Sequence, residues 1–164
     1  MKSLALTLTS LSLLAIYADG ARADQRVIDF DTMSGVDGPF LSNTNPIRGV
    51  PGGGLPWVVD RARGRLTADG GLDVEVRGLV IPANLGFGFN PAPFFKLVVS
   101  CLSPGDGQVS VVNVTTNNGA EVMMGDPQDG DAHFKTHVDL PSRCVAPIVF
   151  VTSPGGAWFA ATGG

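Results

Sequence analysis

The segment Leu72-Asp73-Val74-Glu75-Val76-Arg77 carries the clearest strand pattern in this chain of 164 residues. Apolar and charged residues alternate along it without a break. Because successive side chains of a strand point to opposite faces, Leu72, Val74 and Val76 would share one face and the charges the other. The segment therefore predicts a strand with one buried face and one face in water.

Short strands are predicted on both sides of this segment. Asp69-Gly70-Gly71 before it predicts a tight turn. Residues 133–140 repeat the alternation, with Phe134, Thr136 and Val138 on one face. Other runs rich in β-branched and aromatic residues lie between glycines and prolines, which is typical of strands. These runs span residues 26–31, 56–60, 65–68, 95–102, 108–115, 121–124, 144–151 and 157–161.

Local signals add detail to these strands. Residues 61–64 are turn-like and would separate two strands. The apolar phase shifts at Val111-Val112, which predicts a bulge, and Asn118-Gly119 predicts a hairpin. Pro147 has no N–H to donate to a ladder, so it predicts a bulge or an edge position.

About eight or nine short strands, with no helical periodicity after residue 23, predict an all-β domain. A sandwich and a small barrel both fit this spacing. We favour an antiparallel β-sandwich, because residues 108–115 and 144–151 are apolar on both faces, as in a sandwich core. No repeat or linker divides the chain, so we expect a single domain over residues 24–164.

Residues 1–23 have the order of a secretory signal peptide. Lys2 precedes an apolar run over residues 4–18, and Ala21-Arg22-Ala23 is an A-x-A cleavage signature. A run of about 15 residues suits a signal-peptide helix but is shorter than a membrane span, and no later run is long enough. The sequence therefore predicts a secreted protein, extracellular or, in a Gram-negative host, periplasmic.

The charge of the chain limits its partners. The formal charge is −4, and it becomes −5 without Lys2, Arg22 and Asp19 of the predicted signal peptide. An acidic surface disfavours nucleic acid, whose binders present a basic face, and it disfavours attachment to anionic lipid. We therefore expect the partner to be an extracellular protein or a glycan.

Two cysteines follow the predicted cleavage site, Cys101 and Cys144. In an exported protein an even pair of cysteines predicts one disulfide. Neither histidine stands in a recognisable relation to a cysteine, so we expect no catalytic thiol.

Aromatic residues supply the candidate binding contacts. Residues 86–95 contain four phenylalanines among glycines and prolines, which predicts a loop rather than a regular strand. Phe87 and Phe89 in this loop, and Trp57 after a run of glycines, could contact a sugar ring or an apolar partner surface. The alternative is that these rings close the ends of the hydrophobic core.

The candidate metal ligands are carboxylates and histidines. Asp126, Asp129 and Asp131 lie within six residues and could supply oxygen ligands to calcium. They lack the EF-hand order, however, and a solvated turn explains the same composition. His133 and His137 would lie roughly 13 Å apart on a strand, too far for one zinc ion. We predict no cofactor and no metal, with calcium as the open alternative.

The sequence contains no nucleophile elbow, zinc-protease motif or P-loop. Its only glutamates are Glu75 and Glu121, whereas a glycosidase needs a suitably spaced pair of carboxylates. We predict a non-catalytic structural or interaction protein. A small carbohydrate-binding module, with or without bound calcium, is the alternative, and a secreted hydrolase is the third possibility.

The C-terminal part resembles known sequences. Cys144-Val145-Ala146-Pro147-Ile148-Val149-Phe150-Val151, with the closing Trp158-Phe159, is similar to small secreted β proteins of uncharacterised, mainly bacterial families. Residues 73–82 and 91–101 resemble the same proteins. The resemblance implies a small secreted β protein and assigns no catalytic or binding residue.

Overall fold

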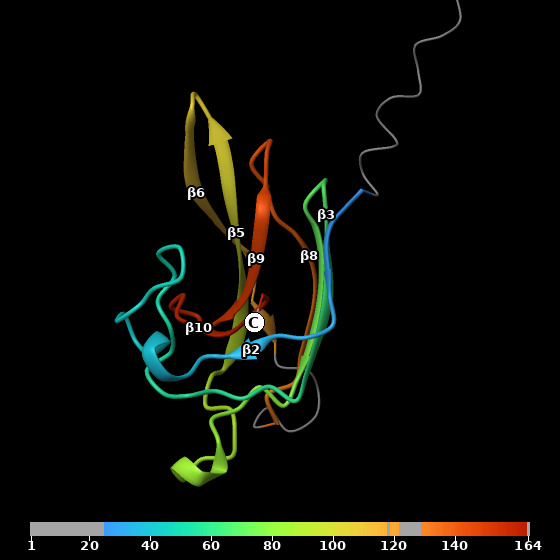
Figure 1. Cartoon of the computed structure of the whole chain (residues 1–164). Coiled ribbons are helices and arrows are strands. Elements are labelled where there is room, and N and C mark those ends of the chain that lie inside the picture. The colour runs from blue at the N-terminus through green and yellow to red at the C-terminus, as the bar shows by residue number, and fades with distance from the viewer. Residues whose placement is uncertain (1–24, 118, 122–128, 164) are drawn as a thin grey trace, which may run out of the picture.

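The computed structural model describes residues 25–117, 119–121 and 129–163, and it consists of two antiparallel β-sheets packed face to face (Figure 1). The first sheet comprises, in spatial order, β1 (Arg26–Phe30), β3 (Arg61–Thr67), β4 (Gly71–Arg77) and β8 (Ala132–His137). The strand predicted over residues 72–77 is confirmed, and the strand predicted over residues 133–140 is present but ends at His137.

The second sheet comprises, in spatial order, β2 (Ser34–Gly35), β10 (Trp158–Ala161), β9 (Val145–Thr152), β5 (Phe94–Gly105) and β6 (Gln108–Thr115). The two-residue β7 (Ala120–Glu121) pairs with the start of β5. Two single-turn 3₁₀ helices, η1 (Gly38–Phe40) and η2 (Ala83–Leu85), lie in the connections. The predicted all-β antiparallel sandwich is therefore confirmed.

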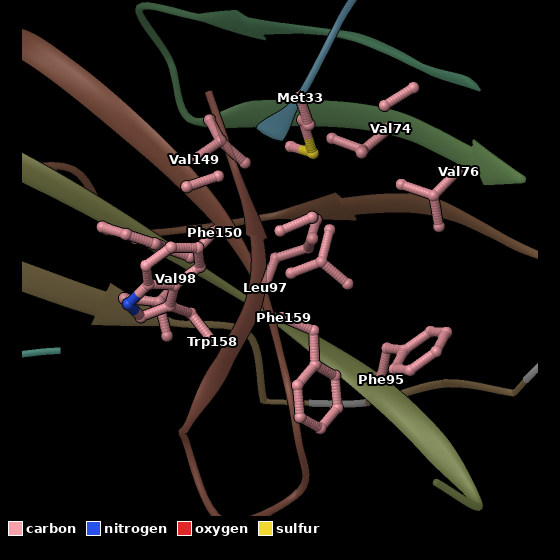
Figure 2. Close-up of a cluster of buried hydrophobic side chains, with 14 of the residues drawn as sticks. Met33, Val74, Val76, Phe95, Leu97, Val98, Val149, Phe150, Trp158 and Phe159 are labelled. Carbon is pink, nitrogen blue, oxygen red and sulfur yellow. The ribbon is translucent and has the colours of Figure 1, made fainter. Parts of the chain in front are cut away.

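The hydrophobic core lies between the two sheets. Val74 and Val76 of β4 and Leu97 of β5 are fully buried there (Figure 2). At one end of this core Trp57 stacks on Phe159, with ring centroids 3.8 Å apart. Because apolar and polar side chains alternate along the strands, each sheet turns its apolar side chains toward the other sheet, and together they form the core.

The second sheet is covered on its far face as well. Trp158 and Phe150 lie on the opposite side of this sheet from Phe159 (Figure 2), yet all three are buried. A segment that we call the covering loop, residues 37–55, packs over Trp158, and the Phe40 ring lies 6.3 Å from the Trp158 ring. The nearly all-apolar sequence of β9 is explained by this burial on both faces.

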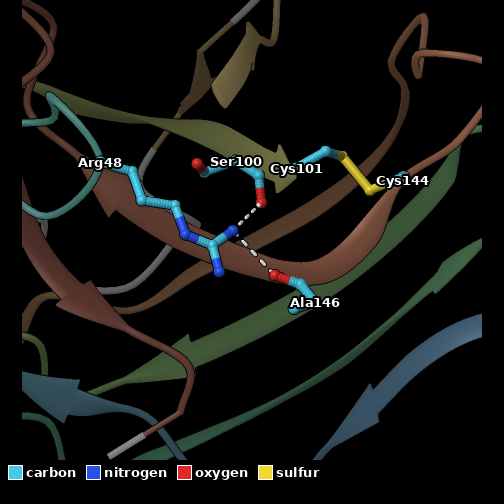
Figure 3. Close-up of a disulfide and its surroundings, with 5 residues drawn as sticks. All are labelled: Arg48, Ser100, Cys101, Cys144 and Ala146. Carbon is cyan, nitrogen blue, oxygen red and sulfur yellow. Dashed lines mark hydrogen bonds between the residues drawn. A yellow bond between two sulfur atoms is a disulfide. The ribbon is translucent and has the colours of Figure 1, made fainter. Parts of the chain in front are cut away.

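Arg48 fixes the covering loop to the sheet (Figure 3). Its Nη1 donates to the carbonyl oxygens of Ser100 on β5, at 3.1 Å, and Ala146 on β9, at 2.8 Å. The register of β9 against β5 shifts between the pairs Ser100↔Ile148 and Leu102↔Val145, which confirms the bulge predicted at Pro147. Within this bulge the Ala146 backbone has a φ of 46°, and the Ala146 carbonyl accepts the hydrogen bond from Arg48.

The turn predicted over residues 61–64 is wrong, because β3 runs through it without interruption. Gly64 faces the inside of the sandwich, opposite Phe30 of β1. A Cβ at Gly64 would lie 2.7 Å from Cζ of Phe30 and 2.6 Å from the carbonyl oxygen of Asp73. Glycine is therefore needed here because the Phe30 ring occupies the space of a side chain, and not because the chain turns.

The strand predicted over residues 56–60 is also wrong, since Val58 forms only an isolated bridge with Val80.

The bulge predicted at Val111-Val112 is wrong. β6 pairs with β5 in one unbroken register, from Val98↔Thr115 to Gly105↔Gln108. β6 is also an edge strand, and the expectation that residues 108–115 are buried on both faces is wrong. Val109 and Val111 are 65% and 47% exposed. An apolar run cannot by itself distinguish a central strand from an uncovered edge.

The hairpin predicted at Asn118-Gly119 is not formed by β6 and β7. Ala120 and Glu121 instead pair with Phe95 and Phe94, further along the same side of β5. Residues 118 and 122–124 lie outside the described residues.

The predicted disulfide is confirmed: Cys101 of β5 is bonded to Cys144, just before β9, with a Cα–Cα distance of 4.8 Å (Figure 3). The predicted signal peptide, residues 1–23, lies outside the described residues. Among the residues that are described, no helix has the length and apolar character needed to cross a membrane.

Candidate ligand-binding face

The charged side chains of the first sheet gather on its outer face. β3 contributes Arg61, Arg63 and Arg65, which alternate with residues that face the core. Every second residue of β4 and of β8 also points outward, because successive side chains of a strand lie on opposite faces. We call this surface the basic face and define it by Asp29, Arg61, Arg63, Arg65, Asp73, Glu75, Arg77, His133 and Lys135.

The basic face concentrates the cations of an acidic protein. Nine lysines and arginines follow residue 24, and five of them belong to the basic face, together with three carboxylates. The rest of the chain must therefore carry most of the negative charge. A surface of locally reversed sign attracts anionic ligands over a Debye length.

Glu75 is the most strongly paired carboxylate of the basic face. Its Oε2 accepts from Nε and Nη2 of Arg63, at 2.8 and 2.5 Å, and its Oε1 accepts from Nε of Arg77 at 2.7 Å. The hydrogen bonds from Arg77 and then Arg63 lower the pKa of Glu75 from 4.5 to about 2. Glu75 is therefore ionised over the physiological range, and it fixes the positions of two guanidinium groups.

Asp73 organises the neighbouring row of charges. Its Oδ1 lies 2.9 Å from Nε2 of His133, and its Oδ2 lies 4.0 Å from Nη2 of Arg65. Arg61 and Lys135 form no ion pair with any residue that the structure describes. The face thus combines cations held in place by carboxylates with cations whose charge is uncompensated nearby.

The basic face is hollowed at its centre. A depression of about 490 Å³ is lined by residues from all four strands: Asp29, Phe30, Arg63, Gly64, Arg65, Asp73, Glu75 and His133. Its volume lies in the range of small-molecule sites, although its shape is open rather than enclosed. An open, charged trough is better suited to part of an extended polar ligand than to an isolated small molecule.

The candidate aromatic contacts are separated by the structure. Trp57 is only 4% exposed and stacks on Phe159, so its assignment as a ligand contact is wrong: the ring belongs to the core. Phe87 is 41% exposed and Phe89 is half-buried. Their ring centroids lie 5.6 Å apart and their planes are tilted by 47°. Together they form part of a projecting loop but not a flat stacking platform.

The loop that carries Phe87 is closed by backbone hydrogen bonds. Ile81 N–H donates to the Phe89 carbonyl at 3.2 Å, and Gly88 N–H donates to the Ile81 carbonyl at 2.9 Å. In Figure 1 this loop, with η2, projects from one end of the sandwich. Its order and its exposed Phe87 keep it as a second candidate contact surface.

The candidate metal ligands do not form a cluster in the described part of the chain, where no group of three or more acidic, histidine or cysteine side chains could hold an ion. Asp126 lies outside the described residues. Asp129 is exposed, and Asp131 accepts a hydrogen bond from Gly78 N–H at 2.9 Å. His133 contacts Asp73, as described above, rather than His137.

The sequence alone does not predict the basic face. Arg61-x-Arg63-x-Arg65 has the spacing of one strand face, but Gly64 within it was interpreted as part of a turn. The remaining members come from strands far apart in the sequence. A correct interpretation of residues 61–67 as a strand would have found the arginine row.

No family model, curated protein or solved structure matches this chain. The resemblance of its C-terminal segments to small secreted β proteins therefore stays a prediction. Its function has to be inferred from its own residues.

Proposed function

We propose that this protein is a secreted, non-catalytic binding protein that holds an acidic glycan on its basic face. The observation that carries the proposal is that five of the nine lysines and arginines after residue 24 lie on one face of a chain whose net charge is negative. The partner is thus a glycan, one of the two classes that the sequence suggests, and its acidic groups distinguish it from a neutral sugar.

The geometry of β3 supports a polymeric anion. Arg61, Arg63 and Arg65 point to the same side at intervals of roughly 7 Å, the repeat of two strand residues. Guanidinium groups bind carboxylate or sulfate oxygens in two parallel hydrogen bonds. Acidic groups that recur along an extended glycan could therefore meet successive arginines, while Asp73 and Glu75 accept hydrogen bonds from its hydroxyls.

The state of Glu75 supports binding rather than catalysis. A glycosidase needs a general acid whose pKa is raised toward the working pH. The two arginines act in the opposite direction and lower the pKa of Glu75 to about 2. Secretion is supported by the leader-like residues 1–23 and by the oxidised Cys101–Cys144 pair.

The projecting loop offers a second candidate function, binding of a neutral glycan or an apolar partner. The observation in its favour is the exposure of Leu85 and Phe87, two positions apart on an uncharged loop. The tilt between the Phe87 and Phe89 rings leaves a single exposed ring rather than a platform. The basic face has more groups that can bind in concert, so we rank it first.

The proposal is tested with soluble polysaccharides as probes. Heparin and polygalacturonate serve as acidic probes and dextran as the neutral one, with binding measured by titration calorimetry at low salt. The double variant Arg61→Ser, Arg65→Ser should lower affinity for an acidic probe about tenfold or more, because two charge-assisted contacts are lost. Added salt should weaken wild-type binding further.

The matched control is Lys96→Ser, Arg143→Ser, which removes the same charge outside the first sheet. Its affinity should stay within about twofold of the wild type. Equal losses of affinity in the two double variants would show that binding depends only on the net charge of the protein. Absence of binding to both acidic probes would refute the proposal, and tighter binding to dextran that depends on Phe87 would favour the second candidate.

A further inference from the structure

β6 differs from the other edge strands of this fold. It forms one border of the second sheet and pairs only with β5 among the described strands. Its eight residues, Gln-Val-Ser-Val-Val-Asn-Val-Thr, include no charge, proline or glycine, and its register contains no bulge. A long, regular, uncharged edge presents a row of N–H and C=O groups to any other strand that can pair with it.

The remaining edges have features that hinder such pairing. β1 carries Arg26 and Asp29 and has a register shift at its first residues. β8 carries His133, Lys135 and His137 over six residues. β2 and β7 are only two residues long. Charge, irregularity and short length are the usual means of protecting an edge, and β6 has none of them.

The exposed side chains beside this edge are apolar. Val109 and Val111 of β6 point to the far side of the second sheet, and Val111 lies opposite Leu102, which in turn pairs with Val145. Val109, Val111 and Val145 are three of the most exposed large apolar residues in the described chain. In Figure 1 the tip of the β5–β6 hairpin reaches beyond the covering loop.

We propose that β6 is a self-association edge, at which a second copy of this chain adds its own β6 in antiparallel orientation. A two-fold axis perpendicular to the sheet pairs one residue of β6 with its own copy. An axis at Val111, in the middle of the strand, places the two exposed Val111 side chains next to each other. The result is one continuous sheet across two molecules, with both apolar strips on the same side.

A second copy fits this edge because the strand is neutral. Two acidic molecules repel each other through their net charge. Because β6 is uncharged, pairing of two β6 strands places no like charges opposite each other. The shared length is roughly 27 Å for eight residues. An interface of this width is narrower than that of a permanent dimer, so the association is reversible and depends on concentration.

The test is analytical ultracentrifugation of the oxidised protein without its signal peptide, from micromolar to millimolar concentration, alongside two lysine variants. Val111→Lys places like charges beside each other at the axis and should weaken dimerisation about tenfold or more. Val58→Lys is the matched control, because Val58 is 44% exposed and lies away from β6. It should dimerise as the wild type does.

Hydrogen exchange adds a second measurement that needs no variant. Protection of the β6 amides that face away from β5 should rise with protein concentration, while amides of β1 and β8 should be unchanged. A wild type that stays monomeric at millimolar concentration would overturn the proposal, and so would equal effects of the two lysine variants. Polysaccharide binding by the basic face is a property of one molecule, so it can fail or succeed independently.

Discussion

Glu75 shows how single residues set the properties of the basic face. Its carboxylate joins Arg63 on β3 to Arg77 on its own strand, which holds three flexible side chains in one arrangement. The same contacts lower its pKa to about 2. A carboxylate with a lowered pKa in the folded state links stability to pH.

Glu75→Gln is predicted to remove a pH-dependent part of the stability. The contribution of Glu75 is fully present above its ordinary pKa of 4.5 and is lost as the pH falls toward about 2. The difference in unfolding free energy between wild type and variant should therefore shrink over that interval. Urea unfolding at a series of pH values measures it. Arg77→Gln should reduce the same pH dependence, and a difference that is constant with pH would contradict the assignment.

Gly64 shows where residue-level interpretation failed. Glycine is common in turns, and the sequence provides no sign that a phenylalanine 34 positions earlier needs its space. Only the pairing of β1 with β3 places Phe30 opposite Gly64. The basic face was missed for the same reason, since its members share a surface only through strand pairing.

At the scale of elements, the alternating strands could be predicted and the apolar ones only in part. β4 and β8 have charges on one phase, which fixes both their type and their orientation. β6 and β9 both have apolar residues on both faces. β6 is nevertheless an exposed edge strand, whereas β9 is a central strand. The difference depends on the covering loop, whose path over the sheet has no sequence signature.

Arg48 is predicted to be the main attachment of the covering loop. Arg48→Ala removes two hydrogen bonds to the carbonyls of Ser100 and Ala146. The loss should lower the unfolding free energy by about 1–3 kcal/mol, because a charged donor is removed from two carbonyl acceptors, one of them partly buried. Urea unfolding measures the change.

Hydrogen exchange places the effect of Arg48→Ala within the molecule. The Gly52 amide donates to the Ser42 carbonyl within the covering loop, and the Gly53 amide donates to the Trp158 carbonyl of β10. Both amides should exchange faster in the variant. Arg143→Ala is the control, since Arg143 is exposed and forms no ion pair with the described residues. Unchanged stability in Arg48→Ala would show that apolar packing and backbone hydrogen bonds hold the loop without the Arg48 side chain.

At the scale of the whole molecule, two sheets and a covering loop form three layers, and one disulfide closes a long segment of the chain. Cys101 and Cys144 are 43 positions apart and enclose β6, β7 and β8. In the loop-closure description, a cross-link of this length stabilises the fold by about 4 kcal/mol. The double variant Cys101→Ala, Cys144→Ala should lose a similar amount in urea unfolding.

Reduction of the wild type separates the cross-link from the substitutions. Reduced wild type and the double variant should unfold at similar urea concentrations, both well below the oxidised protein. If the oxidised and reduced forms were equally stable, the disulfide would have no structural role. A loss in the variant alone would indicate that the cavity left by buried Cys101 dominates.

The same bond determines what a proteolytic nick can do to the fold. Any single cut between Cys101 and Cys144 leaves two fragments that remain one covalent molecule. The C-terminal fragment would still contribute β9 and β10 to the middle of the second sheet. A nicked chain can therefore keep its central strands in register without an intact backbone.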